Sequence, residues 1–387
     1  MKILHVVGWL APRYGGTVSV VTELVPRTAG RGHEVEVITT NVDGSGVLPV
    51  PTDIPTEWAG LTATFHSVDP PRRYLTSWSM LGALRERIAE FDVVHIHSLY
   101  RFHTVAASLI AKRRGVPYVL QAHGALDPWN RRRRRRAKDV YHALIEDRII
   151  NGAATLLCTS SQEELGVREL GYEVATRVVP LGIDAAALRA RANPNAFPAL
   201  ANIPAGDPIV AFLGRVSLVK GLDRLLAAFR DLAHQFPDVH LVVAGPDDEG
   251  ILRKLAPKNA EWGISERVVF GGPLADSAKR ALLQRASVFV LPSAGESFGL
   301  AAAEAMAVGC PVVVSSRVAV QDIVSQSGAG IVTSREPVDI AQAIATVLRD
   351  PARAAEMGKA GRRAADERFS WPHVIDQLES LYGSLGA

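Results

Sequence analysis

The chain has 387 residues, of which 48% are apolar and 6% aromatic, and its formal net charge is +3. That is about two domains' worth of chain with enough apolar surface to fill hydrophobic cores, which excludes a disordered or fibrous protein. Many aliphatic and few aromatic residues are typical of proteins with buried parallel strands, so an all-β fold is not expected.

The sequence carries no sign of a membrane span or of export. It contains no window of about 18 uncharged apolar residues, and MKILHVV at the N-terminus leads into charged and turn residues without a cleavage site. Cys158 and Cys310 lie apart in apolar stretches, which predicts two reduced core thiols instead of disulfides or a zinc site. We expect a cytoplasmic protein.

In the first half, short apolar runs alternate with segments of helical periodicity, which predicts repeated βαβ units and a parallel sheet. The predicted strands are 2–7, 34–40, 63–68, 92–98, 118–124, 154–160 and 177–183. The main predicted helices are 17–30, 76–90, 103–114 and 138–151.

A second series of alternating elements follows a linker rich in Ala, Asn and Pro, which runs from Asp184 to Asp207. Its predicted strands are 208–214, 239–245, 267–272, 288–293, 311–316 and 330–334, and the tail from Pro337 is helical with a break near 369–372. The fold class is therefore α/β, with two Rossmann-like domains, 1–184 and 185–369, that face each other across a cleft. Ligands of such sheets bind outside the carboxyl ends of the strands.

Gly15 and Gly16 follow the first predicted strand and precede a helix. Glycines let backbone N–H groups at a helix start approach an anion, although a simple tight turn explains the pair equally well. The spacing is not G-x-G-x-x-G, so a nicotinamide cofactor is not indicated.

Two cations, Arg215 and Lys220, follow the first strand of the second half. They suit a diphosphate, because a guanidinium can form bidentate hydrogen bonds with two phosphate oxygens and an ammonium group acts as a point charge. A pair of solvated loop cations is the alternative.

Two carboxylates eight residues apart follow the fourth strand of the second half. Glu296 falls in the loop and Glu304 inside the next helix, whose start is kept narrow by Gly299 and three alanines. A carboxylate on so apolar a helix needs a partner, and the vicinal hydroxyls of a ligand are good donors to it. This pattern indicates a functional segment.

Taken together, Gly15-Gly16, His123-Gly124, Arg215 with Lys220, and the E-x7-E segment from Glu296 to Glu304 resemble the retaining GT-B glycosyltransferases of family four. The resemblance covers essentially the whole chain. It implies that the last helix, 370–387, crosses back and completes the first domain.

The resemblance also implies roles for the motif residues. Glu304 would accept hydrogen bonds from ribose hydroxyls and Glu296 would contact the donor sugar, beside His123. Arg215 and Lys220, with the Gly16 amide across the cleft, would stabilise the charge that develops on the diphosphate. The residues implied to bind the nucleotide sugar are Gly15, Gly16, Leu274, Ser297, Phe298, Gly299, Leu300 and Glu304.

No metal and no cofactor is expected, because the nucleotide sugar is a substrate and the cations can take the developing charge. The chain has no D-x-D motif. His95 and His97 point to one face of a strand at metal-ligand spacing, but no third ligand is evident in the sequence.

The basic excess is concentrated in a run from Arg131 to Arg136. A solvated face, an anionic membrane surface or a phosphorylated acceptor would each explain it, whereas no nucleic-acid motif accompanies it. We expect acceptor recognition by the loops at 72–74, 100–101 and 126–136. If the run binds anionic lipid, the protein is peripheral at the inner face of the membrane; if the run is a solvated face, it is not.

The predicted function is retaining, metal-independent transfer of a sugar from a UDP- or GDP-sugar to a saccharide or lipid-linked acceptor, in polysaccharide or glycoconjugate biosynthesis. The residues alone permit an inverting reaction with His123 as general base. A nucleotide-sugar epimerase or a glycosyl phosphorylase on the same architecture is the alternative, and a non-enzymatic sugar-binding protein is a more distant one.

Overall fold

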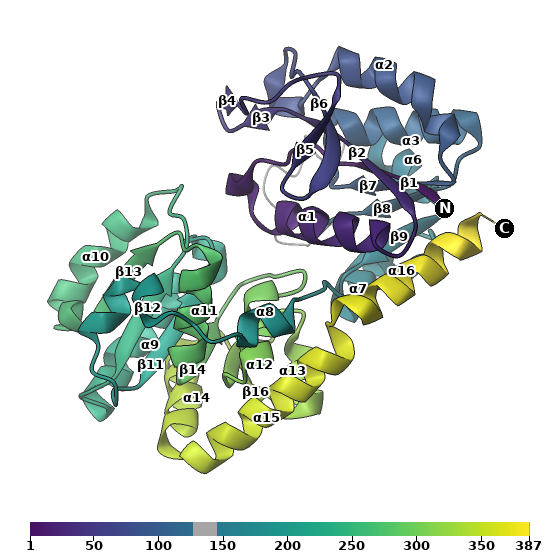
Figure 1. Ribbon diagram of the computed structural model, residues 1–387. Helices are drawn as coiled ribbons and strands as arrows, with labels where there is room; N and C mark the ends of the chain where they lie inside the picture. The colour runs from purple at the N-terminus through teal and green to yellow at the C-terminus, as the bar shows by residue number, and fades with distance from the viewer. Residues whose placement is uncertain (127–144, 387) are drawn as a thin grey trace. The chain divides into compact units, whose positions relative to one another are not determined.

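The computed structural model describes residues 1–126 and 145–386 and is an α/β protein (Figure 1). The chain divides into two compact units. Unit 1 contains Met1–Gly182 and Trp371–Ala387, and unit 2 contains Ile183–Ser370. Each unit is built around one sheet of mostly parallel strands with helices on its faces, so the predicted fold class is confirmed.

The sheet of unit 1 has eight strands in the order β10-β9-β8-β7-β1-β2-β6-β5, all parallel except for the antiparallel pair β5 and β6. The strands are β1 Lys2–Val6, β2 Glu34–Thr40, β5 Pro55–Trp58, β6 Leu61–His66, β7 Val93–His97, β8 Tyr118–Gln121, β9 Thr155–Cys158 and β10 Thr176–Val178, with a small ribbon of β3 Val42–Asp43 and β4 Gly46–Val47. The helices are α1 Gly16–Ala29, α2 Trp78–Arg87, α3 Phe102–Arg114, α6 Asp147–Asn151, α7 Ser161–Glu169 and α16 Trp371–Leu385.

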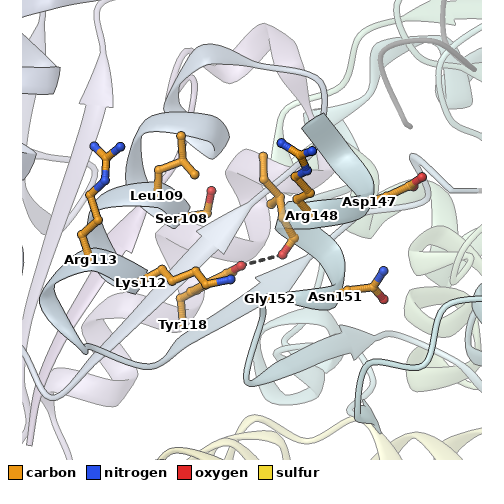
Figure 2. Close-up of a pocket in the computed structure, with 10 residues that line it drawn as sticks. Ser108, Leu109, Lys112, Arg113, Tyr118, Asp147, Arg148, Asn151 and Gly152 are labelled. Atoms are coloured by element: carbon orange, nitrogen blue, oxygen red, sulfur yellow. Dashed lines mark hydrogen bonds between the residues drawn. The ribbon is translucent and has the colours of Figure 1, made fainter. Parts of the chain in front are cut away.

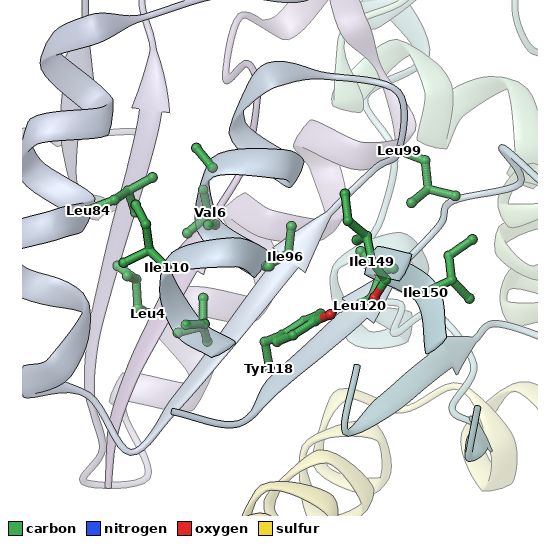
Figure 3. Close-up of a cluster of buried hydrophobic side chains, with 14 of the residues drawn as sticks. Leu4, Val6, Leu84, Ile96, Leu99, Ile110, Tyr118, Leu120, Ile149 and Ile150 are labelled. Atoms are coloured by element: carbon green, nitrogen blue, oxygen red, sulfur yellow. Dashed lines mark hydrogen bonds between the residues drawn. The ribbon is translucent and has the colours of Figure 1, made fainter. Parts of the chain in front are cut away.

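The two faces of this sheet differ in what they bury. Side chains alternate along each strand, so Leu4, Val6 and Ile96 point to one face and pack with α2, α3 and α6 (Figure 3). Ile3 and Val93 point to the other face and pack with α16. On that second face the strands also carry His5, His95 and His97, all fully buried.

Helix α16 returns to unit 1 because its apolar stripe packs beneath the sheet. Val374, Ile375, Leu378 and Tyr382 recur at helical spacing and are buried there. The ring of Trp371 lies so close to Gly182 that a Cβ at that glycine would meet it at 2.4 Å.

Unit 2 has six parallel strands in the order β13-β12-β11-β14-β15-β16. They are β11 Ile209–Leu213, β12 His240–Ala244, β13 Val268–Gly272, β14 Val288–Leu291, β15 Val312–Ser315 and β16 Gly330–Thr333. The helices are α8 Ala185–Arg189, α9 Leu222–Gln235, α10 Ile251–Glu261, α11 Asp276–Arg285, α12 Leu300–Val308, α13 Gln321–Ser327, α14 Pro337–Arg349 and α15 Pro351–Arg368. The order reverses between β11 and β14, the position at which sheets of this kind bind ligands.

Some elements differ from the sequence prediction. The strand predicted at 177–183 ends at Val178, because Pro180 has no N–H to continue the pairing. Strand β5 was not predicted. Of the helix predicted at 138–151, residues 138–144 lie outside the described residues. No helix within the described ranges is long and apolar enough to cross a membrane.

Candidate active site

The loops that follow β11 and β14 in unit 2 are held together at the switch point. Gly221 has φ +73°, and a Cβ there would lie 2.3 Å from the carbonyl oxygen of Pro292. The amide of Ala294 donates to the carbonyl of Val219 at 2.7 Å. This close approach brings the Nζ of Lys220 into an ion pair with Glu296, whose side chains are 20% and 19% exposed. Two predicted site residues therefore touch.

The loop that carries Glu296 is fixed on its other side by the chain after β15. The Glu296 amide donates to the carbonyl of Arg317 at 3.1 Å, and the Val320 amide donates to the carbonyl of Phe298 at 2.9 Å. Gly299 has φ +100° and admits no Cβ, because one would lie 2.7 Å from Val318 Cγ1. Helix α12 then starts at Leu300 without a side-chain cap. Its first N–H groups are therefore suited to an anion or to polar oxygens.

Glu304 lies in α12 and has a protein partner that the sequence did not reveal. Lys279 of α11 donates from Nζ to Oε1 of Glu304 at 2.8 Å. Burial raises the pKa of Glu304, and the charge of Lys279 opposes that rise. Burial alone would lower the pKa of Lys279, but Glu304 outweighs it and the pKa is raised. The carboxylate thus keeps a second oxygen with which a ligand hydroxyl can bond.

Arg215 and Leu274 belong to the same end of the sheet. Arg215 is exposed directly after β11, and Leu274 is partly buried after β13. The strand ends pack closely, since a Cβ at Gly245 would lie 2.0 Å from the carbonyl oxygen of Gly214. The hydrogen bonds and ion pairs within the described ranges do not join Arg215 or Leu274 to the Lys220–Glu296 pair.

In unit 1, the turn after β1 leaves an open helix start. Gly15 has φ +63° and precedes α1, which begins at Gly16 without a side-chain cap. A Cβ at either glycine would meet no atom within 4 Å. The turn therefore needs glycine at 15 for its conformation, while the Gly15 amide itself donates to the carbonyl of Pro12 at 3.1 Å.

His123 follows β8 and has a strained backbone. Its φ is +49°, unusual for a residue other than glycine, and the next residue, Gly124, has φ +75°. The Gly124 amide donates to Oε1 of Glu163 at 3.0 Å, which holds the turn. Burial lowers the pKa of His123 to about 4, so the ring is neutral at pH 7. Such local strain is often retained at functional sites.

Behind His123 lies a cluster of buried histidines. Nε2 of His123 is 3.0 Å from Nδ1 of His97, and Nε2 of His97 is 2.9 Å from Nδ1 of His5. Nδ1 of His95 bonds to the hydroxyl of Tyr382 at 2.7 Å. The sequence analysis missed His5 as the third member of the group, although neighbouring strands with histidine at matching positions would have signalled it.

The nitrogens of His5, His95 and His97 lie within 4.8 Å of one another, which is compatible with a metal site. The geometry fits a metal poorly, however. Both ring nitrogens of His97 already bond to other imidazoles. The rings of His95 and His97 are stacked with 4.2 Å between centroids, so they do not converge on a common point.

The loops expected to recognise an acceptor gather arginines after the carboxyl ends of the unit 1 strands. Nη1 of Arg101 donates to the carbonyl of Arg73 at 2.7 Å, and the guanidinium of Arg73 lies 4.6 Å from the centroid of the Tyr74 ring. Nη2 of Arg72 donates to the carbonyl of Gly46 at 2.9 Å. The run Arg131–Arg136 lies outside the described residues.

Unit 1 also has a pocket of about 600 Å³ between α3 and α6 that contains none of the predicted site residues (Figure 2). Lys112, Arg113 and Arg148 line it together with Asp147. Tyr118 closes its floor by donating its hydroxyl hydrogen bond to the carbonyl of Ile149. Asp147 is engaged by the hydroxyl of Tyr172, the hydroxyl of the buried Ser108 donates to the carbonyl of Val105, and the three cations are exposed. Among the described residues, the lining therefore offers no buried polar side chain that is left for a ligand.

The chain resembles known proteins along nearly its whole length. Residues 196–364 match the family described as Glycosyl transferases group 1, and residues 15–182 match the Glycosyl transferase 4-like domain. The alpha-maltose-1-phosphate synthase of Mycolicibacterium smegmatis is 30% identical over 76% of this chain and 79% of the relative. The D-inositol 3-phosphate glycosyltransferase of Nocardia farcinica is 30% identical over 96% of this chain and 85% of the relative.

A solved structure shares the fold at lower sequence identity. Anabaena Alr3699/HepE in complex with UDP-glucose is 18% identical and superposes with a TM-score of 0.79. The similarity covers 99% of this chain and 100% of the other.

Proposed function

The chain belongs to the family 4 glycosyltransferases with the GT-B fold, and from this membership we propose that it transfers a sugar from a UDP- or GDP-sugar with retention of configuration and without a metal ion. The observation that carries the proposal is the pair of polar contacts at one end of the unit 2 sheet. Lys220 bonds to Glu296, and Lys279 bonds to Glu304. Retention is proposed from the family membership, because the spacing of the two carboxylates alone permits either stereochemical outcome.

Leaving-group stabilisation is the main catalytic contribution that we assign to unit 2. When the bond between the anomeric carbon and the diphosphate oxygen breaks, negative charge develops on that oxygen. Lys220 is held in place by Glu296 before the reaction, and Arg215 lies between the end of β11 and Lys220. Fixed cations and the N–H groups at the start of α12 stabilise this charge without rearranging. A metal ion is then not needed to stabilise the diphosphate as it leaves. The departing phosphate oxygen takes the proton of the attacking acceptor hydroxyl.

For the acceptor, we propose a saccharide or polyol that carries a phosphate, either a small molecule or a lipid-linked one. The arginines at 72, 73 and 101 at the carboxyl edge of the unit 1 sheet support an anionic group, because guanidinium groups bind phosphate oxygens in pairs. The names of two relatives, a maltose-1-phosphate synthase and an inositol 3-phosphate glycosyltransferase, also contain a phosphate.

The test is a two-step assay on the whole chain. Thermal-shift screening with UDP, GDP and ADP identifies the base, since a ligand that binds only the native protein raises Tm. The matching sugar nucleotides are then incubated with inositol 3-phosphate, with glucose 1-phosphate and with unphosphorylated sugars, each with and without EDTA. We expect an α-linked product from an α-linked donor, unaffected by EDTA. A β-linked product would refute retention, and loss of turnover in EDTA would refute metal independence.

The alternative functions give different results in the same assay. An epimerase releases free nucleotide from the donor alone, at the rate of its normal turnover. A phosphorylase consumes its saccharide with inorganic phosphate and needs no nucleotide sugar. We expect only slow hydrolysis of the donor without an acceptor, and no phosphorolysis.

We further propose that the run Arg131–Arg136 attracts the chain to anionic membrane surfaces, because each surface cation near such a surface contributes about 1 kcal/mol. Replacement of the six arginines with serine should reduce sedimentation with phosphatidylserine vesicles at low salt. Unchanged sedimentation would contradict the membrane role and favour a solvated basic segment.

A further inference from the structure

A chain of three hydrogen-bonded imidazoles runs through unit 1 and ends at His123. His5 of β1 contacts His97 of β7, and His97 contacts His123 at distances of 2.9 and 3.0 Å between ring nitrogens. The rings of each pair are within 19° of parallel, with centroids 5.3 Å apart. Both hydrogen bonds join the same pair of atoms, because Nδ1 of His5 faces Nε2 of His97 and Nδ1 of His97 faces Nε2 of His123.

All three rings are neutral at physiological pH. Burial lowers the pKa of His5 to about 3 and that of His123 to about 4, and burial together with the neighbouring histidines lowers that of His97 well below its usual value. Among the described residues, the other titratable groups near these three rings are His95, His103 and Tyr382, with Arg101 next to His103. No carboxylate of the described ranges perturbs the three rings.

A neutral imidazole has one donor and one acceptor nitrogen, so both bonds of His97 must run in the same direction. Either every proton points toward His123, with all three rings protonated at Nδ1, or every proton points toward His5, with all three rings protonated at Nε2. The two arrangements leave opposite groups at the two ends of the chain.

The inner end of the imidazole chain, at His5, distinguishes the two proton arrangements. Nε2 of His5 is buried and has no hydrogen-bond partner within the described part of the protein. If the protons pointed inward, this nitrogen would be a buried N–H without an acceptor, which is the rarer and costlier defect. If the protons point outward, toward His123, Nε2 of His5 carries only a lone pair that accepts no hydrogen bond.

We propose that His97 and His5 are positioning residues that fix His123 in the Nδ1–H tautomer, so that His123 presents a hydrogen-bond donor to a ligand oxygen and cannot act as a general base. The strained turn at His123 serves the same end, because it places the ring where Nε2 faces His97. In the described residues no protein group bonds Nδ1 of His123, and the ring is partly exposed, so this donor is available to a ligand. The catalytic part of this inference rests on the proposed glycosyl transfer, whereas the tautomer does not.

The first experiment reads the tautomers in the full-length chain without any substrate. Protein labelled with ¹⁵N in its histidines gives long-range ¹H–¹⁵N correlations that distinguish Nδ1–H from Nε2–H, and single substitutions assign the signals. We expect Nδ1–H for His5, His97 and His123 between pH 6 and 8. An Nε2–H signal for His123, or a ring that titrates in this range, would overturn the inference.

The second experiment removes the central ring and compares three variants. His97→Phe removes the donor to His123, so we expect mixed tautomers of His123 and a kcat lowered by about 10-fold or more, with donor KM little changed. His97→Asn places an amide N–H near the former Nδ1 and should restore the Nδ1–H tautomer and most of the turnover. His95→Phe is the matched control, because His95 is equally buried on the same strand face but bonds to Tyr382. It should leave the His123 tautomer unchanged.

The outcomes separate this inference from the proposed function. If the wild-type chain transfers no sugar from any nucleotide donor but His123 is an Nδ1–H ring, the proposed function fails and the tautomer assignment stands. If the wild-type chain is active and His97→Phe changes neither the tautomer nor kcat, the inference is wrong. If His97→Phe does not fold, the wild-type tautomers and His97→Asn still decide the direction of the chain.

Discussion

Lowering the pH should destabilise unit 1 because its core contains neutral histidines. His5, His95, His97 and His103 are all fully buried. Burial is the largest cause of the lowered pKa of each, to about 3 for His5 and about 4 for His103. In the unfolded chain these histidines bind protons when the pH falls below about 6.5, the ordinary pKa of a histidine side chain. In the folded chain they stay neutral at that pH, so acid favours the unfolded state. Stability is therefore complete above pH 6.5 and is lost as the pH falls below it.

The size of the effect follows from proton linkage. At pH 5.5, one histidine that ionises only in the unfolded chain costs about 1.4 kcal/mol, and at pH 7.5 it costs less than about 0.1 kcal/mol. His123, whose pKa burial also lowers to about 4, makes five such residues, which together lower the free energy of unfolding by about 7 kcal/mol between these pH values. Because a domain has about 5–15 kcal/mol in total, unit 1 should approach its unfolding midpoint near pH 5.

Urea denaturation at pH 7.5, 6.5 and 5.5, followed by tryptophan fluorescence, measures this effect. Of the tryptophans that the structure describes, all except Trp262 belong to unit 1, so the signal reports mainly that unit. His95→Phe should reduce the loss of stability by about a fifth, because it removes one of five histidines that contribute about equally. His373→Gln removes an exposed histidine of α16 and should leave it unchanged. A loss below about 2 kcal/mol in the wild type, or the same loss in His95→Phe, would refute the reasoning.

Three substitutions in unit 2 test the site. Lys220→Ala should lower kcat by about 10²-fold or more if the ammonium stabilises the leaving group, and unchanged turnover in steady-state assays would remove it from the mechanism. Glu304→Ala should weaken nucleotide binding by about 10-fold in calorimetry, since a bond from a ribose hydroxyl to a carboxylate is lost; equal affinity contradicts the ribose role. Gly221→Ala should lower the free energy of unfolding by about 1–3 kcal/mol in denaturation, because the new Cβ would meet the carbonyl oxygen of Pro292. Gly206→Ala is the control, because its Cβ would meet no atom within 4 Å and the free energy of unfolding should not fall.

Strands could be predicted from the sequence where a run of apolar or alternating residues marks both ends of the strand. Strand β2 covers residues 34–40, as the alternating EVEVITT predicts. Strand β5 was missed because PTEW has no periodic apolar pattern and becomes a strand only through antiparallel pairing with β6. Its formation depends on tertiary contact, which local sequence does not encode.

The site residues were predictable as motifs, but their partners were not. The spacing of Glu296 and Glu304 indicates a functional segment, and the need of Glu304 for a partner was foreseen. That partner was expected to be a ligand hydroxyl, and the structure adds Lys279 from another helix. The bond between His5 and His97 likewise joins residues 92 positions apart. Such pairs arise from strand order and helix packing, and no short spacing in the sequence reports them.

The buried histidines connect the stability of unit 1 with the chemistry at its edge. Apolar side chains would fill the sheet face beneath α16 at less cost, since each unpartnered imidazole nitrogen there is desolvated without a hydrogen bond. Unlike apolar side chains, a chain of hydrogen-bonded imidazoles fixes which ring nitrogen of His123 carries the proton, because each ring in the chain sets the tautomer of the next. If His123 acts as a donor, its ring does not need to titrate during turnover. The acid limit of activity should then coincide with the unfolding of unit 1, not with the protonation of His123.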